Sequence, residues 1–544
     1  MIGIHMKNIK YTALVFMSMA LLFTGCDKSQ KKNTKPHSYQ TAKQTLRINI
    51  CAEPGTLDPR KARNLNDLNV IKMLQEGLTR INFEGIVKLA LAESIELSND
   101  QKTYTIKIRD AKWSNGEPIT SYDFAYAWKK ALSPTFPAAN AGLLYFIRNA
   151  QKVKEGQIPT SMLGVSTPDT GTLVVKLDRP TPFFKELLAS PTFFPVHSVT
   201  DKAMPSWADN AETYIGCGPF KIKSWKHSNT LIVEKNDGYF DKNDVKLQEI
   251  HMSMVSAETG FNMYQNGELD WEGSPLSVLP LDAMDTLTEN NQLKTQAILS
   301  TTFLRTNIRK APFNSEKVRK AFAYALDRKS IIDDLLSGHP DFATGLVPKV
   351  MGLRESEYFT DNQSDEVKRL IESALNDSSI VRRDLNKIKL TFISREKNYR
   401  LAQVLQQQIK ANLGIDIELD AVEAQVYFSR ISSQDYQITI CSWEADFRDP
   451  INFLEVFKTR DIGTNNTNWS NDKYLAMIEK SYDLQDPNER MALLQECESL
   501  LIDEMPIIPL YHGKMHYVKN SKVRDVVFSQ SGGIDFKWAF IDNK

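Results

Sequence analysis

The sequence predicts a mixed α/β protein built of several lobes. Its 544 residues exceed what one hydrophobic core usually serves, so more than one domain is expected. Segments in which apolar residues alternate, as in strands, are interleaved with segments in which they recur every three or four positions, as in helices. The strand-like segments 388–393 and 415–419 flank a helical pattern over 401–413, which predicts a β-α-β unit.

The other elements follow from the same two periodicities. Strands are expected at 46–50, 103–108, 173–177 and 436–440, a hairpin at 221–225 with 230–235, and helices at 69–78, 120–130, 318–326 and 488–502. Thr120 is the expected N-cap of the second helix. Asp123 stands at the third helical position, where its carboxylate can accept from the backbone of the cap.

The charge balance excludes some classes of function. Lys plus Arg equals Asp plus Glu at 67 each, so no basic excess indicates nucleic acid as a partner. Hydrophobic residues make up 42% of the chain, which is an ordinary share for a soluble globular protein. Only the apolar stretch 11–23 is long enough to consider as a membrane segment.

That stretch predicts a signal peptide over residues 1–25. It follows a short positively charged segment and is too short for a permanent membrane-spanning helix. The small residues before Cys26 resemble a bacterial lipobox, so we expect Cys26 to be lipidated and residues 26–45 to form a flexible tether. By resemblance to other Gram-negative lipoproteins, Asp27 favours retention at the inner membrane. The alternative is an ordinary signal peptide with an incidental cysteine.

The remaining cysteines and one histidine pair are candidate metal or redox groups. The cysteines lie far apart without a CxxC pair, which argues against zinc, while one disulfide and buried free thiols are both consistent with the pattern. They are Cys51, Cys217, Cys441 and Cys497. His512 and His516 have metal-like spacing, but their surroundings predict strands around a turn, which would point the two rings apart.

The chain contains no recognisable enzyme motif. It has no GxxxxGK[ST] phosphate loop and no GxSxG nucleophile elbow, and the glycines at 216 and 218 lack the third glycine of a dinucleotide loop. We therefore expect a binding protein with no catalytic residues, no cofactor and no metal ion. Catalytic groups drawn from distant segments are the alternative.

The richest chemical neighbourhood is the segment CSWEADFRDP at 441–450. It follows the predicted strand 436–440, and loops at the carboxyl ends of strands in open α/β sheets commonly line ligand crevices. Trp443 offers a rigid aromatic surface, and a nearby carboxylate can hold a cation by a charge-assisted hydrogen bond. The alternative is a tryptophan packed in the core with Asp449 capping the next helix.

Several blocks of residues, in fixed order, are typical of one family. The most specific runs from Ala92 to Phe124 and contains RDAKWSNG at 109–116. Supporting blocks are Leu57-Asp58-Pro59, Gly218-Pro219-Phe220, Gly267-Glu268-Leu269-Asp270, Val318-Arg319-Lys320-Ala321 and Trp443-Glu444-Ala445-Asp446. From about residue 46 to near its C-terminus, the chain resembles the bacterial periplasmic oligopeptide-binding proteins, the family 5 extracellular solute-binding component of peptide ABC importers.

The resemblance implies a three-lobed α/β fold of the periplasmic binding protein type II-like class. In this fold a hinge motion encloses the ligand between lobes I and III. Lobe boundaries are then expected at 46–75, 200–299 and 513–544 for lobe I, 76–199 for lobe II, and 300–512 for lobe III.

The resemblance also implies a function. A periplasmic monomer, held at the cell membrane by its lipid, would capture short peptides and deliver them to an ABC permease with its ATPase subunits. Asp446 matches the aspartate that binds the peptide α-ammonium group, and Trp443 matches the aromatic beside it. The backbone of Cys441 and Ser442 would lie where family members bond the peptide main chain, and Asn307, in a further family block, is expected to contact ligand.

The chain also departs from the family. Ile440 replaces an arginine that pairs with a ligand carboxylate in some oligopeptide binders. Arg63 and Arg305 stand where acidic residues near the peptide are expected, and Asn140 stands where an aromatic is common. The two arginines are candidate anchors for a carboxylate in a shorter or more acidic peptide, such as one derived from the cell wall. The alternative is that both lie at the surface.

Other functions are compatible with the same fold. One is a receptor for murein peptides, dipeptides or another small solute, although the scattered histidines argue against nickel. Another is a sensor or chaperone that works without a permease. A secreted enzyme is a third class, disfavoured by the missing motifs.

Overall fold

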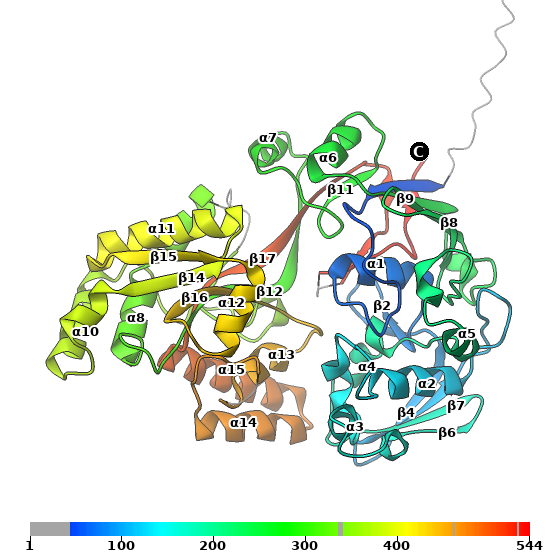
Figure 1. Ribbon diagram of the computed structural model, residues 1–544, viewed down its shortest axis with the longest axis horizontal. Coiled ribbons are helices and arrows are strands. Elements are labelled where there is room, and N and C mark those ends of the chain that lie inside the picture. Colours follow the sequence, from blue (N-terminus) through cyan, green and yellow to red (C-terminus); the bar gives the residue numbers. More distant parts are fainter. Residues whose placement is uncertain (1–43, 336–340, 461–462, 530–531, 544) are drawn as a thin grey trace, which may run out of the picture. The chain divides into compact units, whose positions relative to one another are not determined.

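The computed structural model describes residues 44–335, 341–460, 463–529 and 532–543 (Figure 1). The predicted signal peptide, Cys26 and nearly all of the predicted tether lie outside the described residues. In the described part, no helix combines the length and the apolar character needed to cross a membrane.

An 11-stranded sheet runs through the part of the chain that the structure describes. In spatial order it contains β15 (Ile417–Val422), β14 (Ile388–Ile393), β16 (Ile438–Glu444), β12 (Lys294–Thr306), β17 (Ile507–Lys519), β11 (Trp271–Gly273), β1 (Thr45–Asn49), β10 (Glu249–Ser253), β9 (Thr230–Lys235) and β8 (Phe220–Lys226), with β13 (Asp341–Phe342) paired to β17. The antiparallel strands β12 and β17 are 13 residues long each and connect the two ends of the sheet. Both are buried over most of their length, as central strands usually are.

Smaller sheets complete the strand structure of the described residues. An antiparallel sheet of four strands has the order β4 (Ala92–Leu97), β5 (Thr103–Ile108), β7 (Thr172–Lys176) and β6 (Val165–Asp169). Two-stranded sheets pair β2 (Thr79–Ile81) with β3 (Val87–Leu89), β18 (Val523–Arg524) with β21 (Phe540–Ile541), and β19 (Val527–Phe528) with β20 (Ile534–Asp535). In Figure 1 the four-stranded sheet and its helix α2 are the cyan elements.

Helices cover the sheets. They are α1 (Leu65–Leu74), α2 (Ser121–Ala131), α3 (Ala150–Lys154), α4 (Phe184–Leu187), α5 (Ser198–Ala203), α6 (Ala257–Gln265), α7 (Met284–Glu289), α8 (Glu316–Tyr324), α9 (Arg328–Ser330), α10 (Ser364–Asn376), α11 (Glu396–Leu413), α12 (Ala424–Ser432), α13 (Ile451–Leu454), α14 (Asp472–Asp483) and α15 (Pro487–Glu504). The largest apolar core includes residues of β1, α1, the four-stranded sheet, α14 and α15. A second core surrounds β14, β15 and β16 and contains Ile438 and Ile440.

Many predicted elements are confirmed with small changes at their ends. β14, α11 and β15 form the expected β-α-β unit, with the two strands parallel, and β8 and β9 form the expected hairpin. At the start of α2, the Thr120 N–H donates to the Asp123 carboxylate at 2.9 Å. This bond is the one that the capping pattern predicts.

The helix predicted over 69–78 is displaced, and this prediction is wrong at both ends. α1 begins four residues earlier and ends at Leu74, where Gln75 turns to an extended conformation. The Leu74 carbonyl accepts from the N–H groups of Cys217 and Gly218 at 3.1 and 2.9 Å. A segment distant in the sequence therefore occupies the acceptor at the end of the helix, which the local apolar spacing could not indicate.

The turn predicted between His512 and His516 is also absent, because both lie in the continuous strand β17. Pro509, which would interrupt a regular ladder, stands at a register shift between β17 and β12, where a proline is tolerated. His512 is buried and shares a hydrogen bond with the Thr301 hydroxyl at 2.9 Å. An extended backbone separates the two histidines by roughly 13 Å, which is too far for both to bind one ion.

The thiol groups of the four described cysteines are all free. Cys217 and Cys497 are buried, and Cys51 and Cys441 are half-buried. Of the two arrangements consistent with the sequence, the structure contains free thiols.

Candidate functional site

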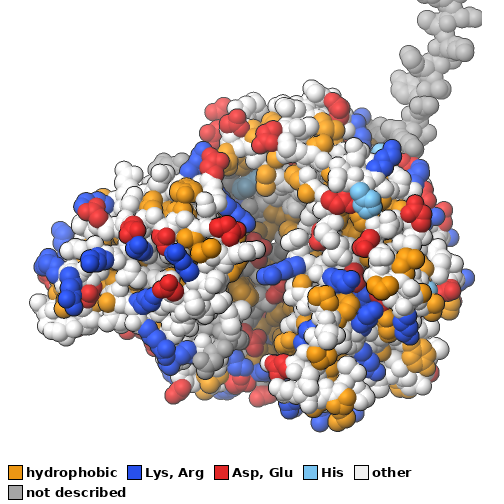
Figure 2. Space-filling view, viewed as in Figure 1, with side chains coloured by type: hydrophobic (Ala, Val, Ile, Leu, Met, Phe, Trp, Pro, Cys, Tyr) orange, Lys and Arg blue, Asp and Glu red, His pale blue; other side chains and the backbone are white. Residues whose placement is uncertain are grey.

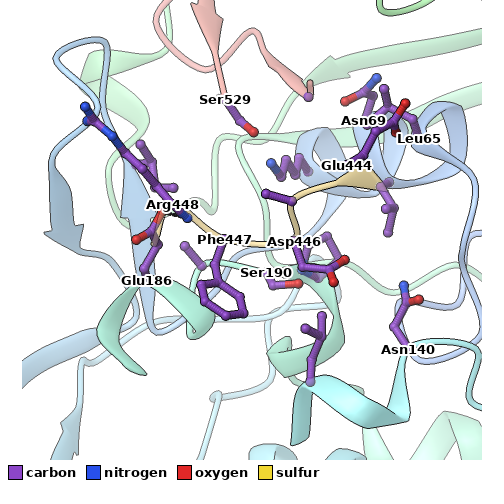
Figure 3. Close-up of a pocket in the computed structure, with 18 of the residues that line it drawn as sticks. Leu65, Asn69, Asn140, Glu186, Ser190, Glu444, Asp446, Phe447, Arg448 and Ser529 are labelled. Atoms are coloured by element: carbon purple, nitrogen blue, oxygen red, sulfur yellow. Dashed lines mark hydrogen bonds between the residues drawn. The ribbon is translucent and has the colours of Figure 1, made fainter. Parts of the chain in front are cut away.

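A cavity that is partly open to solvent lies beside the end of β16 (Figure 3). Figure 2 shows the corresponding face hollowed, with side chains of both charges around the hollow. The walls come from segments far apart in the sequence: residues 444–448 at the end of β16 and in the loop after it, α1 with Arg63 before it, Asn140 and Leu143, residues between 186 and 191, and Phe528, Ser529 and Gly533.

β16 has a free backbone edge next to this cavity. One edge pairs with β12 along the whole strand. The other edge pairs with β14 only at Ile438 and Thr439, so no strand of the described chain covers residues 441–444 on that side. The Tyr427 hydroxyl donates to the Ile440 carbonyl at 2.7 Å, directly before the uncovered stretch. An extended peptide can add to such an edge as a further strand.

The loop after β16 is fixed at both ends. The Ala445 N–H donates to the Leu299 carbonyl of β12 at 2.8 Å. At the other end, Arg490 of α15 makes a bidentate pair with Asp449, with N···O distances of 2.7 and 2.9 Å and both side chains buried. Residues 446–448 therefore project into the cavity from a fixed frame, as Figure 3 shows.

Asp446 is an acidic group of the cavity without an ion-pair partner among the described residues. Its side chain reaches the cavity, but the surrounding protein displaces enough water to raise its pKa, and the charge of Glu444 raises that pKa as well. A hydrogen bond from Asn452 acts in the opposite direction. The Trp443 indole N–H donates to Asn452 at 3.0 Å and so fixes this neighbour. The arrangement suits a cationic ligand group, which would replace the missing water and counter-charge.

One face of α1 forms a further wall of the cavity. Leu65, Leu68, Asn69 and Lys72 line the cavity. Their spacing of three and four residues places them on one side of the helix, while the apolar residues between them are buried in the core on the other side.

Phe447 and Arg448 connect the loop to the segment that contains α4. The Phe447 ring stacks on Phe183 with 4.2 Å between centroids, and it meets Phe146 edge-on at 6.3 Å. The Arg448 backbone N–H donates to the Glu186 carboxylate at 2.8 Å. Burial raises the pKa of Glu186 despite this bond. These contacts close one end of the cavity.

The profile of the bacterial extracellular solute-binding proteins, family 5, matches residues 87–465. The chain belongs to this family. It is 38% identical to the oligopeptide-binding protein OppA of Bacillus subtilis over 95% of both chains. It is 32% identical to the dipeptide-binding protein DppE of the same organism, over 98% of this chain and 99% of the other.

Solved structures of the family share the fold. The murein tripeptide-binding protein MppA of Escherichia coli superposes with a TM-score of 0.76 at 26% identity, covering 92% of this chain and 99% of that one. The fold class implied by the resemblance, a mixed α/β protein of the periplasmic binding protein type II-like class, is thereby confirmed. The boundaries of the three lobes stay a prediction.

The structure brings some of the predicted site residues of this family member to the cavity. Asp446, Arg63 and Asn140 line it. Trp443 and Ser442 lie next to it on β16: the first is half-buried, and the hydroxyl of the second shares a 2.9 Å hydrogen bond with Thr302. Cys441 begins the uncovered stretch of the strand edge, so its backbone and that of Ser442 are available to a ligand main chain.

Two predicted ligand residues lie elsewhere. Asn307 is buried, and its amide donates to the carbonyls of Gln434 and Tyr436 at 2.9 and 3.2 Å, so we assign it to holding these strand ends together. Arg305 is 5% exposed and donates to the Thr464 carbonyl at 3.3 Å. Neither residue lines the cavity, because both lie at the end of β12 opposite to the loop after β16. The alternative placed Arg305 at the surface, and this is also wrong, because the residue is buried.

Asp449 and Trp443 also agree in part with the non-functional alternative. Asp449 accepts from the Ile451 N–H at 3.0 Å at the start of α13, although Pro450 is the N-cap of this helix. Trp443 packs against the main core with part of its ring. A structural role for Trp443 and Asp449 is compatible with a binding role for residues 444–448, which lie between them and line the cavity.

Sequence reasoning missed Asn69, Lys72, Glu186 and Arg448 as cavity residues. The polar face of α1 was a usable signal, because Asn69 and Lys72 are one helical turn apart. No local signal connects Glu186 with Arg448, which are far apart in the sequence. Among the described residues, no three His, Cys, Asp or Glu side chains gather as metal ligands would.

Proposed function

We propose that this protein is the extracytoplasmic receptor of a peptide importer. It captures short peptides in the cavity beside β16 and presents them to an ABC permease driven by its ATPase subunits. It acts as a binding protein, without catalytic residues or a cofactor.

The observation that carries the proposal is the uncovered edge of β16 next to Asp446. Backbone groups of residues 441–444 would hydrogen-bond the main chain of an extended peptide, whatever its side chains. The carboxylate of Asp446 would hold the peptide α-ammonium group at the end of this edge. The cavity is partly open to solvent, so ligand side chains and water can share its mouth.

Relatives support the same function. The names of the two Bacillus subtilis proteins state that they bind oligopeptides and dipeptides. Murein peptides are the second candidate ligand, because MppA is a murein tripeptide-binding protein of the same fold. Arg63 would serve either class of ligand as a contact for a carboxylate, since it lines the cavity and has no ion pair among the described residues.

We further propose a lipid anchor at Cys26 and residence at the outer face of the cytoplasmic membrane. A lipid and a tether of about twenty residues would raise the effective concentration of the receptor at its permease. The three lobes are proposed with the boundaries given above, and the protein is proposed to act as a monomer. Metabolic labelling with a fatty acid, abolished in Cys26→Ser, tests the anchor.

Mass spectrometry of ligands retained by the purified protein tests the function most directly. We expect short peptides with free amino termini, released by unfolding the protein. Peptides carrying diaminopimelate or D-amino acids would favour murein as their source. If the protein retains no peptide and binds none in calorimetry, while another class of solute binds, the proposed function is wrong.

A further inference from the structure

Asn69 has a hydrogen-bond donor that nothing in the described structure uses. The residue is only 1% exposed. Its Oδ1 accepts from the Ile534 N–H at 2.9 Å, which fixes the orientation of the amide. Its Nδ2 is buried and has no partner among the described residues. A buried donor without an acceptor is unfavourable, so such a group in a cavity wall indicates an acceptor that comes with a ligand.

Lys72 lies one helical turn further along α1 and lines the same cavity. It also borders a smaller adjoining cavity. Its ammonium group has three donors, and it forms no hydrogen bond or ion pair with any residue that the structure describes. Burial lowers the pKa of Lys72, as expected for a cation that has lost water without gaining a close partner.

Gly533 lies directly against these groups. A Cβ at this position would come within 3.2 Å of the Lys72 Nζ, 3.3 Å of the Asn69 Oδ1 and 3.4 Å of the Ser529 Oγ. The three polar groups therefore converge over one glycine. A side chain there would crowd the Lys72 ammonium group and the Asn69 amide oxygen.

Two carboxylates that border the smaller cavity together with Lys72 are already occupied. Asp535 accepts two hydrogen bonds from Arg80, at 2.7 and 2.8 Å. Glu76 accepts from Arg80 at 2.7 Å and from the Tyr239 hydroxyl. Glu444 and Asp446 both face the cavity and have no ion pair among the described residues. Asp446 is assigned to the ligand amino terminus, so Glu444 is the competitor for Lys72 to be tested.

We propose that Asn69 and Lys72 form a second binding subsite, which takes a carboxylate of the ligand. The inference rests on the proposed peptide-receptor function and narrows it. The protein would prefer peptides that place a carboxylate at α1 while their amino terminus lies at Asp446. A carboxylate suits the site because its two oxygens can accept from the Asn69 amide and the Lys72 ammonium group together.

Calorimetric titration of alanine peptides tests the subsite. Each peptide, of roughly two to five residues, is compared as the free acid and as the C-terminal amide. In the unaltered protein, the free acid of at least one length should bind about tenfold or more tightly than its amide. Lys72→Met should reduce that acid to the affinity of the amide and leave the affinity of the amide unchanged.

Further variants separate this role from a structural one. Asn69→Asp keeps the acceptor for Ile534 and replaces the free donor by a negative charge, so it should also abolish the preference for the acid. Lys368→Met on the exposed side of α10, which removes the same charge far from the cavity, should preserve that preference. If Glu444→Gln reproduces the loss seen in Lys72→Met, then Lys72 pairs with Glu444 rather than with ligand, and the proposal is overturned.

Two ligand groups can supply the carboxylate, the peptide terminus and an acidic side chain, and a second set of peptides distinguishes them. Amidated peptides with a single glutamate or glutamine at each position are titrated in the same way. A glutamate preference that Lys72→Met removes assigns the subsite to a side chain. If neither comparison responds to Lys72→Met, the subsite does not exist. If amides and acids alike fail to bind, the peptide-receptor function itself falls, and the subsite with it.

Discussion

Replacing Asp446 by asparagine should weaken peptide binding strongly without destabilising the protein. The change keeps the size of the side chain and its ability to accept from Asn452, but it removes the charge that would pair with the ligand ammonium group. Removing one member of a close charge pair at a binding interface costs about 2–5 kcal/mol. Since about 1.4 kcal/mol is a factor of ten, the lower bound corresponds to roughly 30-fold weaker binding.

The pKa of Asp446 makes the stability part of this prediction specific. Its pKa is raised by loss of water, so the ionised carboxylate is unfavourable in the empty receptor at neutral pH. The neutral asparagine should therefore leave the thermal midpoint unchanged or slightly higher. A loss of affinity caused by misfolding would instead lower that midpoint.

Calorimetry with a free and an N-acetylated peptide gives the decisive comparison. The unaltered protein should prefer the free amine by about 30-fold or more, and Asp446→Asn should bind both peptides equally weakly. Glu444→Gln removes a charge from the same cavity and serves as the matched control, with a much smaller effect expected. The reasoning is refuted if Asp446→Asn changes the affinity less than about twofold, or if acetylation is tolerated by the unaltered protein.

Three further predictions concern pH and stability. Peptide affinity should be constant near neutral pH and fall with decreasing pH, because protons compete with the ligand for Asp446. The midpoint of this fall should lie above 3.8, the ordinary pKa of an aspartate. An affinity that calorimetry finds independent of pH down to 3.8 would contradict this. Glu272 is buried, and its pKa is raised from 4.5 to about 7, so the free energy of unfolding should decrease by on the order of 3 kcal/mol as pH rises through this interval. Denaturant titrations should show that Glu272→Gln loses this pH dependence, whereas the exposed control Glu268→Gln retains it. Arg490→Met leaves Asp449 buried and unpaired, so it should destabilise the protein by about 3–5 kcal/mol in denaturant titrations and weaken peptide binding. Arg490→Lys should recover part of both losses. Unchanged stability in Arg490→Met would mean that this pair does not hold the loop.

The sequence alone determined the elements whose stabilising contacts are local. The capping of α2 depends on residues three positions apart, Thr120 and Asp123, and its hydrogen bond forms as predicted. The strands and helix of the β-α-β unit were found from periodicity, because each buries one regular set of apolar side chains. Asp446 was found because it lies in a compact block that resembles one family.

Only the tertiary structure decided features that depend on segments distant in the sequence. α1 ends at Leu74 because Cys217 and Gly218 occupy its last acceptor, and β17 passes without a turn because β12 supplies its hydrogen bonds. The cavity likewise exists because the loop after β16, α1 and the residues around Gly533 pack together. The periodicity of apolar residues indicates which face of a helix is buried. It does not indicate which other segments pack against that face or against the opposite one. For that reason the sequence places Asn69 and Lys72 in a helix, while only the fold shows that they line the same cavity as Asp446.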